Sequence, residues 1–423
     1  MTTSRTPLTA NQIRGFWAAW GGWALDGMDS FIYSLVLAPA LIELLPRSGI
    51  AATAGNVGYY GSVLFALFLI GWGVSMIWGP VADHFGRVRT LIFTILCYSL
   101  FTLLCGVVTN VWQLAIFRLL AGVGIGGEWS MGGTFVAEVW PEDRRRMGAG
   151  YLHTGYYFGF FLAAILNYTI GARYGWRWMF VAGGTPALLV TFIQYGVRES
   201  HTWEKRDVKR VSVAAPFAKL FSATYARRTW LNAIYLLISI VGLWAGSVYV
   251  PTSVREIAVR EGYGATAAQL ASYGTMVLSV GTILGCLVLP PLADRYGRRV
   301  TLGLYFVVMF FSISVGFGYV FYMTHALLPF MVCLFFLGVG GANFAMYTLW
   351  LPEQYTTDCR ASAFAFATSV GRFAGAGITF LVGNGVQYFH TIGTPVAITS
   401  IAFVIGVLLL PFGEETRGKA LPS

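Results

Sequence analysis

The sequence has little formal charge and none of the common catalytic motifs of soluble enzymes. Of its 423 residues, 11% are charged and 57% are hydrophobic, and the mean hydropathy is +0.66. A soluble domain averages about 25% charged residues, so this composition is typical of a chain that lies in a lipid bilayer. No HExxH, GxSxG or GxxxxGK[ST] motif occurs, and no polar segment is long enough to hydrolyse ATP. We therefore expect no enzymatic activity and no cofactor.

Cysteine is also scarce, with five residues and no CxxC pair. Cys97, Cys105, Cys286 and Cys333 lie in apolar runs and are interpreted as small buried side chains, not as a disulfide framework or a metal site. The N-terminus lacks the charged and then purely apolar order of a cleaved signal, so we expect the first apolar run to remain as a helix.

Long apolar stretches, by contrast, recur along the whole chain. Twelve are long enough to cross about 30 Å of hydrocarbon as helices. They cover residues 15–41, 57–80, 90–109, 112–138, 147–170, 177–197, 229–250, 268–292, 300–321, 327–350, 362–386 and 393–412. The sequence predicts an all-α integral membrane protein with an N-terminal six-helix bundle (1–197), a cytoplasmic linker (198–228) and a C-terminal six-helix bundle with a short cytoplasmic tail (229–423).

Basic residues are distributed unevenly over the predicted loops. With the N-terminus inside, 21 of the 28 Lys and Arg residues fall in inner segments and 5 in outer loops. The positive-inside rule then predicts that both termini are cytoplasmic. The net charge of +10 is spread over many loops without a patch for a nucleic-acid backbone, so we expect no nucleic-acid partner.

An internal repeat relates the two predicted bundles. The stretch GPVADHFGRVRT (79–90) recurs as LPPLADRYGRRVT (289–301), and AEVWPEDRR after the fourth span is echoed by PEQYTTDCR after the tenth. A parallel repeat of this kind implies two equivalent bundles related by an axis along the membrane normal. We expect a cavity between them.

The repeated stretches, together with RLLAGVGIGG (118–127), resemble the signatures of the major facilitator superfamily. Four further stretches resemble the proton symporters of organic carboxylates, nearest to the sialate and monocarboxylate group, with the aromatic-acid symporters as a near neighbour: LDGMD (25–29), GGEWSMGGTFVAEVWPEDRRRMGAG (126–150), YGWRWMF (174–180) and SVGRFAGAG (369–377). The resemblance implies the major facilitator fold and proton-coupled symport of a small organic carboxylate by alternating access. The alternatives are a facilitator, a carrier of sugars or aromatic acids, a multidrug/proton antiporter, and a membrane sensor that binds a ligand without moving it.

Five charged side chains fall inside the predicted spans: Asp26, Asp29, Arg118, Glu128 and Arg372. An acidic residue at the centre of a membrane helix costs roughly 2.5 to 3.5 kcal/mol, so each is a candidate functional residue. Asp26 and Asp29 are three residues apart, and like charges held close together favour uptake of a proton. We expect proton coupling at Asp29, Asp26 and Glu128, with Asp29 as the leading candidate; the alternative for Asp26 is a structural carboxylate.

The two intramembrane arginines have different predicted roles. Arg118 is ten residues before Glu128, about 15 Å along a helix, so its partner has to be on another helix or in the substrate. The family resemblance implies that Arg118 takes part in proton coupling; the alternative is a structural ion pair. Arg372 lies among small residues, and its planar guanidinium matches a carboxylate, so we expect it to bind substrate. An internal bridge to Glu128 or Asp29 is the alternative.

Polar side chains on neighbouring spans are candidates to complete the substrate site. They are Tyr156, Tyr157, Asn167, Asn343 and Tyr347. Aromatic residues in membrane helices also serve as packing or interfacial anchors, which is the alternative for each tyrosine. His153 is expected at the membrane interface or in a hydrogen-bonded core.

Charged and glycine residues of the repeated loops are predicted to form a gate. Charge pairs at helix ends can hold neighbouring helices in one state and release them in the other, and glycine permits tight turns. The set is Gly79, Asp83, Gly86, Arg87, Arg89, Glu138, Arg145, Asp294, Gly297, Arg298, Glu353 and Arg360. The alternative is a topology signal.

The expected partners of the protein are a small organic anion, protons and lipid. We expect it to be a monomer in a bacterial inner membrane.

Overall fold

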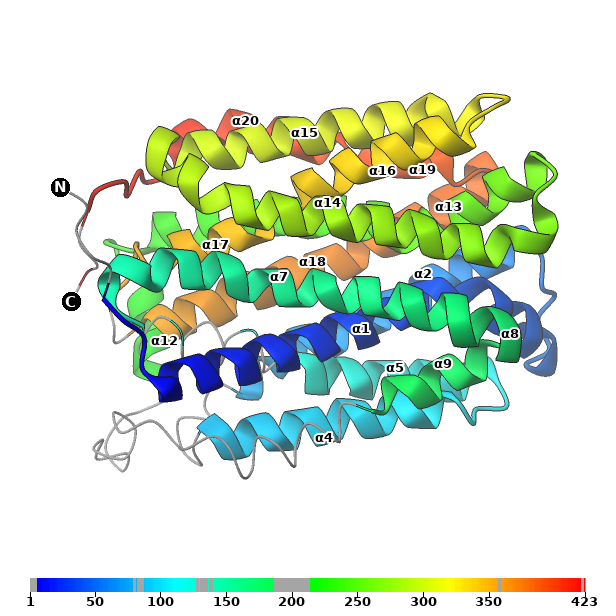
Figure 1. Ribbon diagram of the computed structural model, residues 1–423, viewed down its shortest axis with the longest axis horizontal. Coiled ribbons are helices and arrows are strands. Elements are labelled where there is room, and N and C mark those ends of the chain that lie inside the picture. Colours follow the sequence, from blue (N-terminus) through cyan, green and yellow to red (C-terminus); the bar gives the residue numbers. More distant parts are fainter. Residues whose placement is uncertain are drawn as a thin grey trace.

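A computed structural model describes residues 6–78, 81, 87–126, 129, 136, 140–185, 214–356, 359–419 and 422. Within these ranges the regular structure is helical, and the long helices run side by side with both chain ends at the same end of the molecule (Figure 1). Eight helices of the described residues are long and apolar enough to cross a membrane, and two shorter apolar helices accompany them. The predicted all-α fold class is confirmed.

The first half of the chain forms seven described helices. These are α1 (Ala10–Arg47), α2 (Ala54–Val74), α4 (Arg87–Cys105), α5 (Val111–Ile125), α7 (Glu142–Leu166), α8 (Ala172–Tyr174) and α9 (Trp176–Gly183). A 3₁₀ turn, Ser75–Ile77, extends α2, and a π-helical segment, Asn167–Gly171, joins α7 to α8. The chain turns between α8 and α9 at Gly175, whose φ of 94° suits glycine.

The second half begins with the short helix α12 (Ala214–Leu220). The helices that follow are α13 (Ala226–Arg260), α14 (Ala267–Tyr296), α15 (Arg298–Gly318), α16 (Leu327–Gly341), α17 (Phe344–Trp350), α18 (Arg360–Phe389), α19 (Gly393–Thr399) and α20 (Ile401–Leu409). Three 3₁₀ turns, Gly264–Thr266, Val320–Tyr322 and Leu410–Phe412, lie between or after them.

Several predicted boundaries differ from the structure. The seventh span was predicted to end at residue 250, yet α13 continues through Pro251 to Arg260. Proline disfavours a helix interior, but Val254, Ile257 and Ala258 are fully buried, and their packing holds the extra turns. The predicted linker 198–228 also contains α12 and the first turn of α13.

Two predicted continuous spans are interrupted. The tenth divides into α16 and α17 at Ala342 and Asn343, and the twelfth divides into α19 and α20 at Ser400. The tenth breaks within GVGGAN (338–343), where glycines weaken the preference for helix. The parts of the predicted fourth and sixth spans beyond Ile125 and Gly183 lie largely outside the described residues.

Close helix packing depends on glycine. A Cβ at Gly27 of α1 would meet the backbone of Tyr156 on α7, and one at Gly159 would meet the backbone of Ala24. Small residues at such contacts let helix backbones approach closely. Glycines at the contact also allow close packing of α2 against α5 and of α14 against α16.

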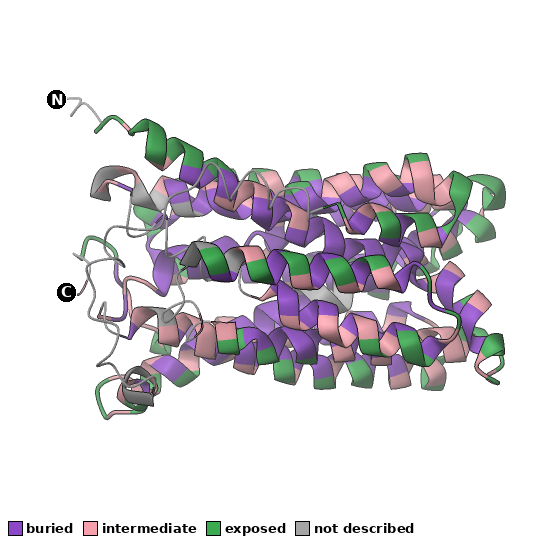
Figure 2. Ribbon diagram, turned by 90° about the horizontal axis from the view of Figure 1, so that it is seen from below, coloured by how far each residue is buried: buried purple, intermediate pink, exposed green. Residues whose placement is uncertain are grey.

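The two halves of the chain meet along four long helices. α2 packs against α18, and α7 packs against α14. Figure 1 shows α4, α5 and α9 on one side of these pairs and α15, α16 and α20 on the other. Buried residues concentrate in the interior between the helices and exposed residues on the outward faces (Figure 2). Four of the five predicted charged residues, Asp26, Asp29, Arg118 and Arg372, are buried in this interior, on α1, α5 and α18.

Candidate substrate and proton site

Arg118 and Asp29 form a buried charge pair between α5 and α1. Both side chains are 0% exposed, and Arg118 Nη1 lies 4.0 Å from Asp29 Oδ2. The guanidinium also lies over the rings of Tyr33 and Phe68, with its Cζ 4.9 and 4.3 Å from the ring centroids. Aromatic faces stabilise a cation, so the arginine is held by a carboxylate and two rings. Arg118 thus has its partner on another helix.

Arg372 lies on α18, where the two halves of the chain meet. Its Cζ is 4.1 Å from the ring centroid of Trp72 and 5.4 Å from that of Trp129, and its side chain is 5% exposed. Among the described residues, no carboxylate lies within ion-pair distance of this guanidinium. Asp26 and the Tyr156 hydroxyl are near enough to interact with it electrostatically. The buried cation is therefore surrounded chiefly by aromatic rings.

The two aspartates have different surroundings. Asp29 faces Arg118, whereas Asp26 interacts electrostatically with Arg372 and Tyr156. Residues three apart on a helix differ by about 60° around its axis, which is enough to direct one carboxylate toward α5 and the other toward α18. Among the described residues, Asp29 forms its ion pair with Arg118 and none with Arg372. Glu128 lies outside the described residues.

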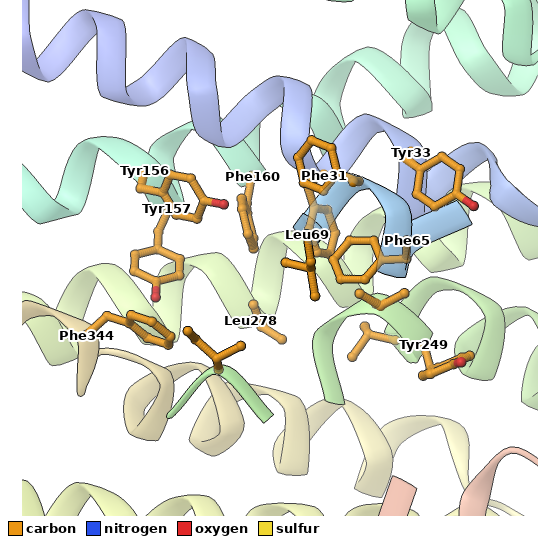
Figure 3. Close-up of a cluster of buried hydrophobic side chains, with 14 of the residues drawn as sticks. Phe31, Tyr33, Phe65, Leu69, Tyr156, Tyr157, Phe160, Tyr249, Leu278 and Phe344 are labelled. Carbon is orange, nitrogen blue, oxygen red and sulfur yellow. The ribbon is translucent and has the colours of Figure 1, made fainter. Parts of the chain in front are cut away.

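Tyr156 and Tyr157, two of the five predicted polar partners, are consecutive residues of α7 and have different neighbours. The Tyr156 ring lies 4.6 Å from that of Trp23 and 6.3 Å from that of Trp72, beside Arg372. The Tyr157 hydroxyl donates to the Gly341 carbonyl at 3.1 Å. In Figure 3 the Tyr157 ring lies between those of Tyr156 and Phe344.

The remaining predicted partners make hydrogen bonds within the protein. Asn343 Nδ2 donates to the Gly340 carbonyl at 2.9 Å, and the Tyr347 hydroxyl lies 2.8 Å from the Ser239 hydroxyl of α13. Asn167 Nδ2 donates to Ser272 Oγ of α14 at 2.9 Å. Asn167 is eleven residues beyond Tyr156, about 16 Å along the helix, so the structure places it apart from Arg372.

Sequence reasoning missed three tryptophans of this site. Trp23 and Trp129 stack with centroids 5.6 Å apart, and Trp129 and Trp72 both contact Arg372. Their only sequence signal is a tryptophan in the middle of a span, away from the interfacial belts where this residue is common.

The prediction for His153 needs correction. Its side chain is 2% exposed, and neither ring nitrogen has a hydrogen-bond partner in the described part of the chain. It is surrounded instead by the rings of Trp23, Trp129, Tyr157 and Phe344, at 5.7 to 6.4 Å between centroids. The predicted span began at residue 147, but α7 begins at Glu142, so His153 lies about 16 Å inside the helix.

The second copy of the repeated loop forms a charge network near the chain ends. Arg298 is 1% exposed and holds Glu353 by two hydrogen bonds of 2.8 and 2.6 Å, with Asp294 at 3.4 Å. Gly297, with a φ of 93°, makes the turn between α14 and α15. The Arg360 Nε donates to the Pro352 carbonyl at 3.1 Å beside this network. The structure brings together all the predicted gate residues of the second copy.

The first copy of the loop is described only in part. Arg89 is exposed, and the side chains of Arg87 and Arg145 lie outside the described part of the structure. The other predicted gate residues of this copy, Gly79, Asp83, Gly86 and Glu138, lie outside the described residues.

Glu415, in the segment after the last helix, is expected to make stability at this end of the protein depend on pH. Burial alone raises its pKa, but hydrogen bonds from the backbone N–H groups of Arg298, Arg299 and Arg417 outweigh burial, so the pKa lies below the usual 4.5. A lowered carboxyl pKa stabilises the fold above the usual pKa and ceases to do so as the pH falls through the lowered value. Thermal unfolding of detergent-purified protein should show Glu415→Gln less stable than wild type at pH 7, with the difference shrinking at pH 4. An equal difference at both pH values would contradict this assignment.

A bundle of long apolar helices with paired charges in its interior defines a membrane transport protein. The chain belongs to the Major Facilitator Superfamily, whose family model matches residues 19–379. It is therefore an integral membrane transporter with the major facilitator fold, and the expected family resemblance is confirmed.

Named relatives and a solved structure agree with this membership. The chain is 32% identical to a probable 4-methylmuconolactone transporter of Cupriavidus pinatubonensis, covering 97% of this chain and 92% of the relative. It is 25% identical to the sialic acid transporter NanX of Escherichia coli, covering 96% and 95%. The structure of the xylose transporter XylE from E. coli matches 98% of this chain and 100% of that chain with a TM-score of 0.72 at 18% identity, a likeness of fold.

Proposed function

We propose that this transporter carries a small organic carboxylate together with protons by alternating access. The observation that supports this most is Arg372, a buried guanidinium where the two halves meet that forms no ion pair with a described carboxylate. An uncompensated charge in a protein interior is costly, so the site favours an anion. A guanidinium offers a planar pair of donors that matches both oxygens of a carboxylate.

The aromatic surroundings of Arg372 favour an aromatic acid as a second candidate substrate. Trp72 and Trp129 flank the guanidinium, and Trp23 and Tyr156 extend the same group of rings. Stacked or edge-to-face aromatic pairs contribute about 0.5 to 1.5 kcal/mol beyond the area they bury. A planar acid therefore has more to gain here than an aliphatic acid of equal size. The names of the two relatives, a lactone transporter and a sialic acid transporter, fit a carrier of small organic acids.

Asp29 is the proposed proton site. When it is ionised, its charge is balanced by Arg118; when it takes a proton from outside, Arg118 is released from its only described ion-pair partner. That change of charge biases one arrangement of the helices over another, which is what coupling requires. The substrate on Arg372 and the proton on Asp29 then cross together, and the higher pH inside removes the proton.

The orientation and architecture are proposed as the sequence predicts them. Both chain ends lie at one end of the molecule (Figure 1), which together with the bias of 21 to 5 basic residues supports two cytoplasmic termini in a bacterial inner membrane. We propose the division into bundles 1–197 and 229–423 and a monomeric carrier on the basis of the internal repeat.

Uptake into proteoliposomes tests the function. An outside pH of 5.5 and an inside pH of 7.5 should drive accumulation of radiolabelled benzoate, lactate or sialic acid above the level in protein-free liposomes, which corrects for passive entry of the neutral acid. A protonophore should abolish the accumulation. Uptake that survives the protonophore without accumulation would indicate a facilitator, and no flux of any acid would contradict the proposal.

A further inference from the structure

Two buried hydrogen bonds join the halves of the protein toward the end opposite both chain ends. Asn167 Nδ2, directly after α7, donates to Ser272 Oγ of α14 at 2.9 Å. The hydroxyls of Ser62 on α2 and Tyr249 on α13 form the other bond. All four side chains are at most 3% exposed. Ser62 and Ser272 lie within about 12 Å of the helix starts at this end, where Figure 1 also shows α8.

The Asn167 side chain comes from an irregular stretch of backbone. Asn167–Gly171 is a π-helical segment, and such segments are frequent at functional sites. A Cβ at Gly171 would meet Asn167 Oδ1, so glycine leaves room for the amide. Ser272 Oγ donates its own proton to the Ala268 carbonyl at 3.1 Å, which leaves its lone pairs free to accept from Asn167. The local structure on both sides therefore supports this contact.

Ser62 lies where α2, α13 and α18 meet. Its hydroxyl bonds to Tyr249 of α13, and a Cβ at Gly383 of α18 would meet its side chain. About one turn earlier on α2, a Cβ at Gly58 would lie 2.9 Å from Val386 Cγ1 of α18. The first half is therefore in close contact with two helices of the second half at this level.

Hydrogen bonds between the halves suit a contact that has to break during each transport cycle. A buried hydroxyl or amide needs its partner, so these bonds favour one arrangement of the two halves. When the halves separate, water enters and replaces each lost bond, so no polar group is left buried and unsatisfied. Such bonds therefore stabilise the closed arrangement without preventing its opening.

We infer that the Asn167–Ser272 and Ser62–Tyr249 bonds form a two-point latch, which holds the outer end closed and is released when the substrate site opens to the outside. This inference rests on the proposed alternating access and orientation, and not on the identity of the substrate. It gives Asn167 a role in the movement of the halves, away from Arg372. The strength of the latch sets how often the substrate site faces outward.

Val386→Cys reports the opening of the outer end. Val386 is 6% exposed and faces Gly58 across the contact between the halves, so a thiol there should react with a membrane-impermeant maleimide only when the halves separate. The labelling rate is measured in bacterial spheroplasts, and protein without Val386→Cys gives the background from the five native cysteines. Asn167→Leu and Tyr249→Phe should each raise the rate about fivefold, the equivalent of one neutral hydrogen bond. Together they should raise it about 25-fold, since effects at independent sites multiply.

Hydrogen bonds within one half provide matched controls. Ser314 and Tyr305 donate to groups of their own half at 2.9 and 2.6 Å. Ser314→Ala and Tyr305→Phe should therefore leave the labelling rate unchanged. Ser272→Ala should raise the rate as Asn167→Leu does, and combining these two should add nothing, because both remove the same bond.

The outcomes separate the latch from the proposed function. A labelling rate that stays within about twofold of the parent in Asn167→Leu, Ser272→Ala and Tyr249→Phe overturns the latch; if wild type still accumulates an acid in proteoliposomes, the proposed function stands. Faster labelling in these variants of a protein that transports no acid would support the latch and contradict the proposed substrate class.

Discussion

Replacing Arg372 with glutamine is expected to lower the uptake of an organic acid at least about 100-fold. A hydrogen bond to a charged group contributes about 1.5 to 3 kcal/mol, and a paired fork makes two of them, so losing both exceeds the roughly 2.7 kcal/mol that corresponds to this factor. The measurement is the initial rate of labelled benzoate or lactate uptake into proteoliposomes of equal protein content.

Two further variants serve as comparisons for Arg372→Gln. Arg372→Lys keeps the charge but loses the planar fork and much of the contact with Trp72, so we expect an intermediate rate. Arg173→Gln removes an exposed arginine and should transport as wild type does. A rate for Arg372→Gln within a few-fold of wild type would show that the substrate carboxylate binds elsewhere.

Asp29→Asn is expected to abolish accumulation driven by a pH gradient while exchange of substrate continues. The amide has nearly the same shape as the carboxylate but takes up no proton, and it leaves Arg118 permanently without its ion-pair partner. The coupled step is then lost, and the ratio of inside to outside substrate should fall to about one. Counterflow of labelled against unlabelled acid should remain measurable, because Arg372 is intact.

Asp26→Asn is the informative comparison for Asp29→Asn. Asp26 interacts electrostatically with Arg372 and Tyr156, whereas Asp29 pairs with Arg118, so we expect a change in apparent affinity for the acid and retained accumulation. If Asp29→Asn accumulates substrate normally and Asp26→Asn does not, the proton site has been assigned to the wrong aspartate.

Local sequence was sufficient for the class of protein and for locating the charged side chains of the candidate site. Charges are costly in hydrocarbon, so Asp26, Asp29, Arg118 and Arg372 stand out in apolar runs without any three-dimensional information. For the same reason the positions of the long helices follow from the length of apolar sequence needed to cross a bilayer. Within the described helices, the predicted spans differ from the structure at helix ends and breaks, such as Pro251 and Asn343, where local preferences compete with packing.

Only the tertiary structure decided which of these residues act together. Hydropathy and helical spacing say how deep a side chain lies, but not which neighbouring helix it faces. That is why the sequence could only group Asp26 and Asp29 as candidates for proton coupling, while in the structure Asp29 pairs with Arg118 of α5 and Asp26 interacts electrostatically with Arg372 of α18. The aromatic group around Arg372 and the unsatisfied His153 arise likewise from contacts between distant segments, because an α-helix buries its residues against whichever helices the whole fold brings to it.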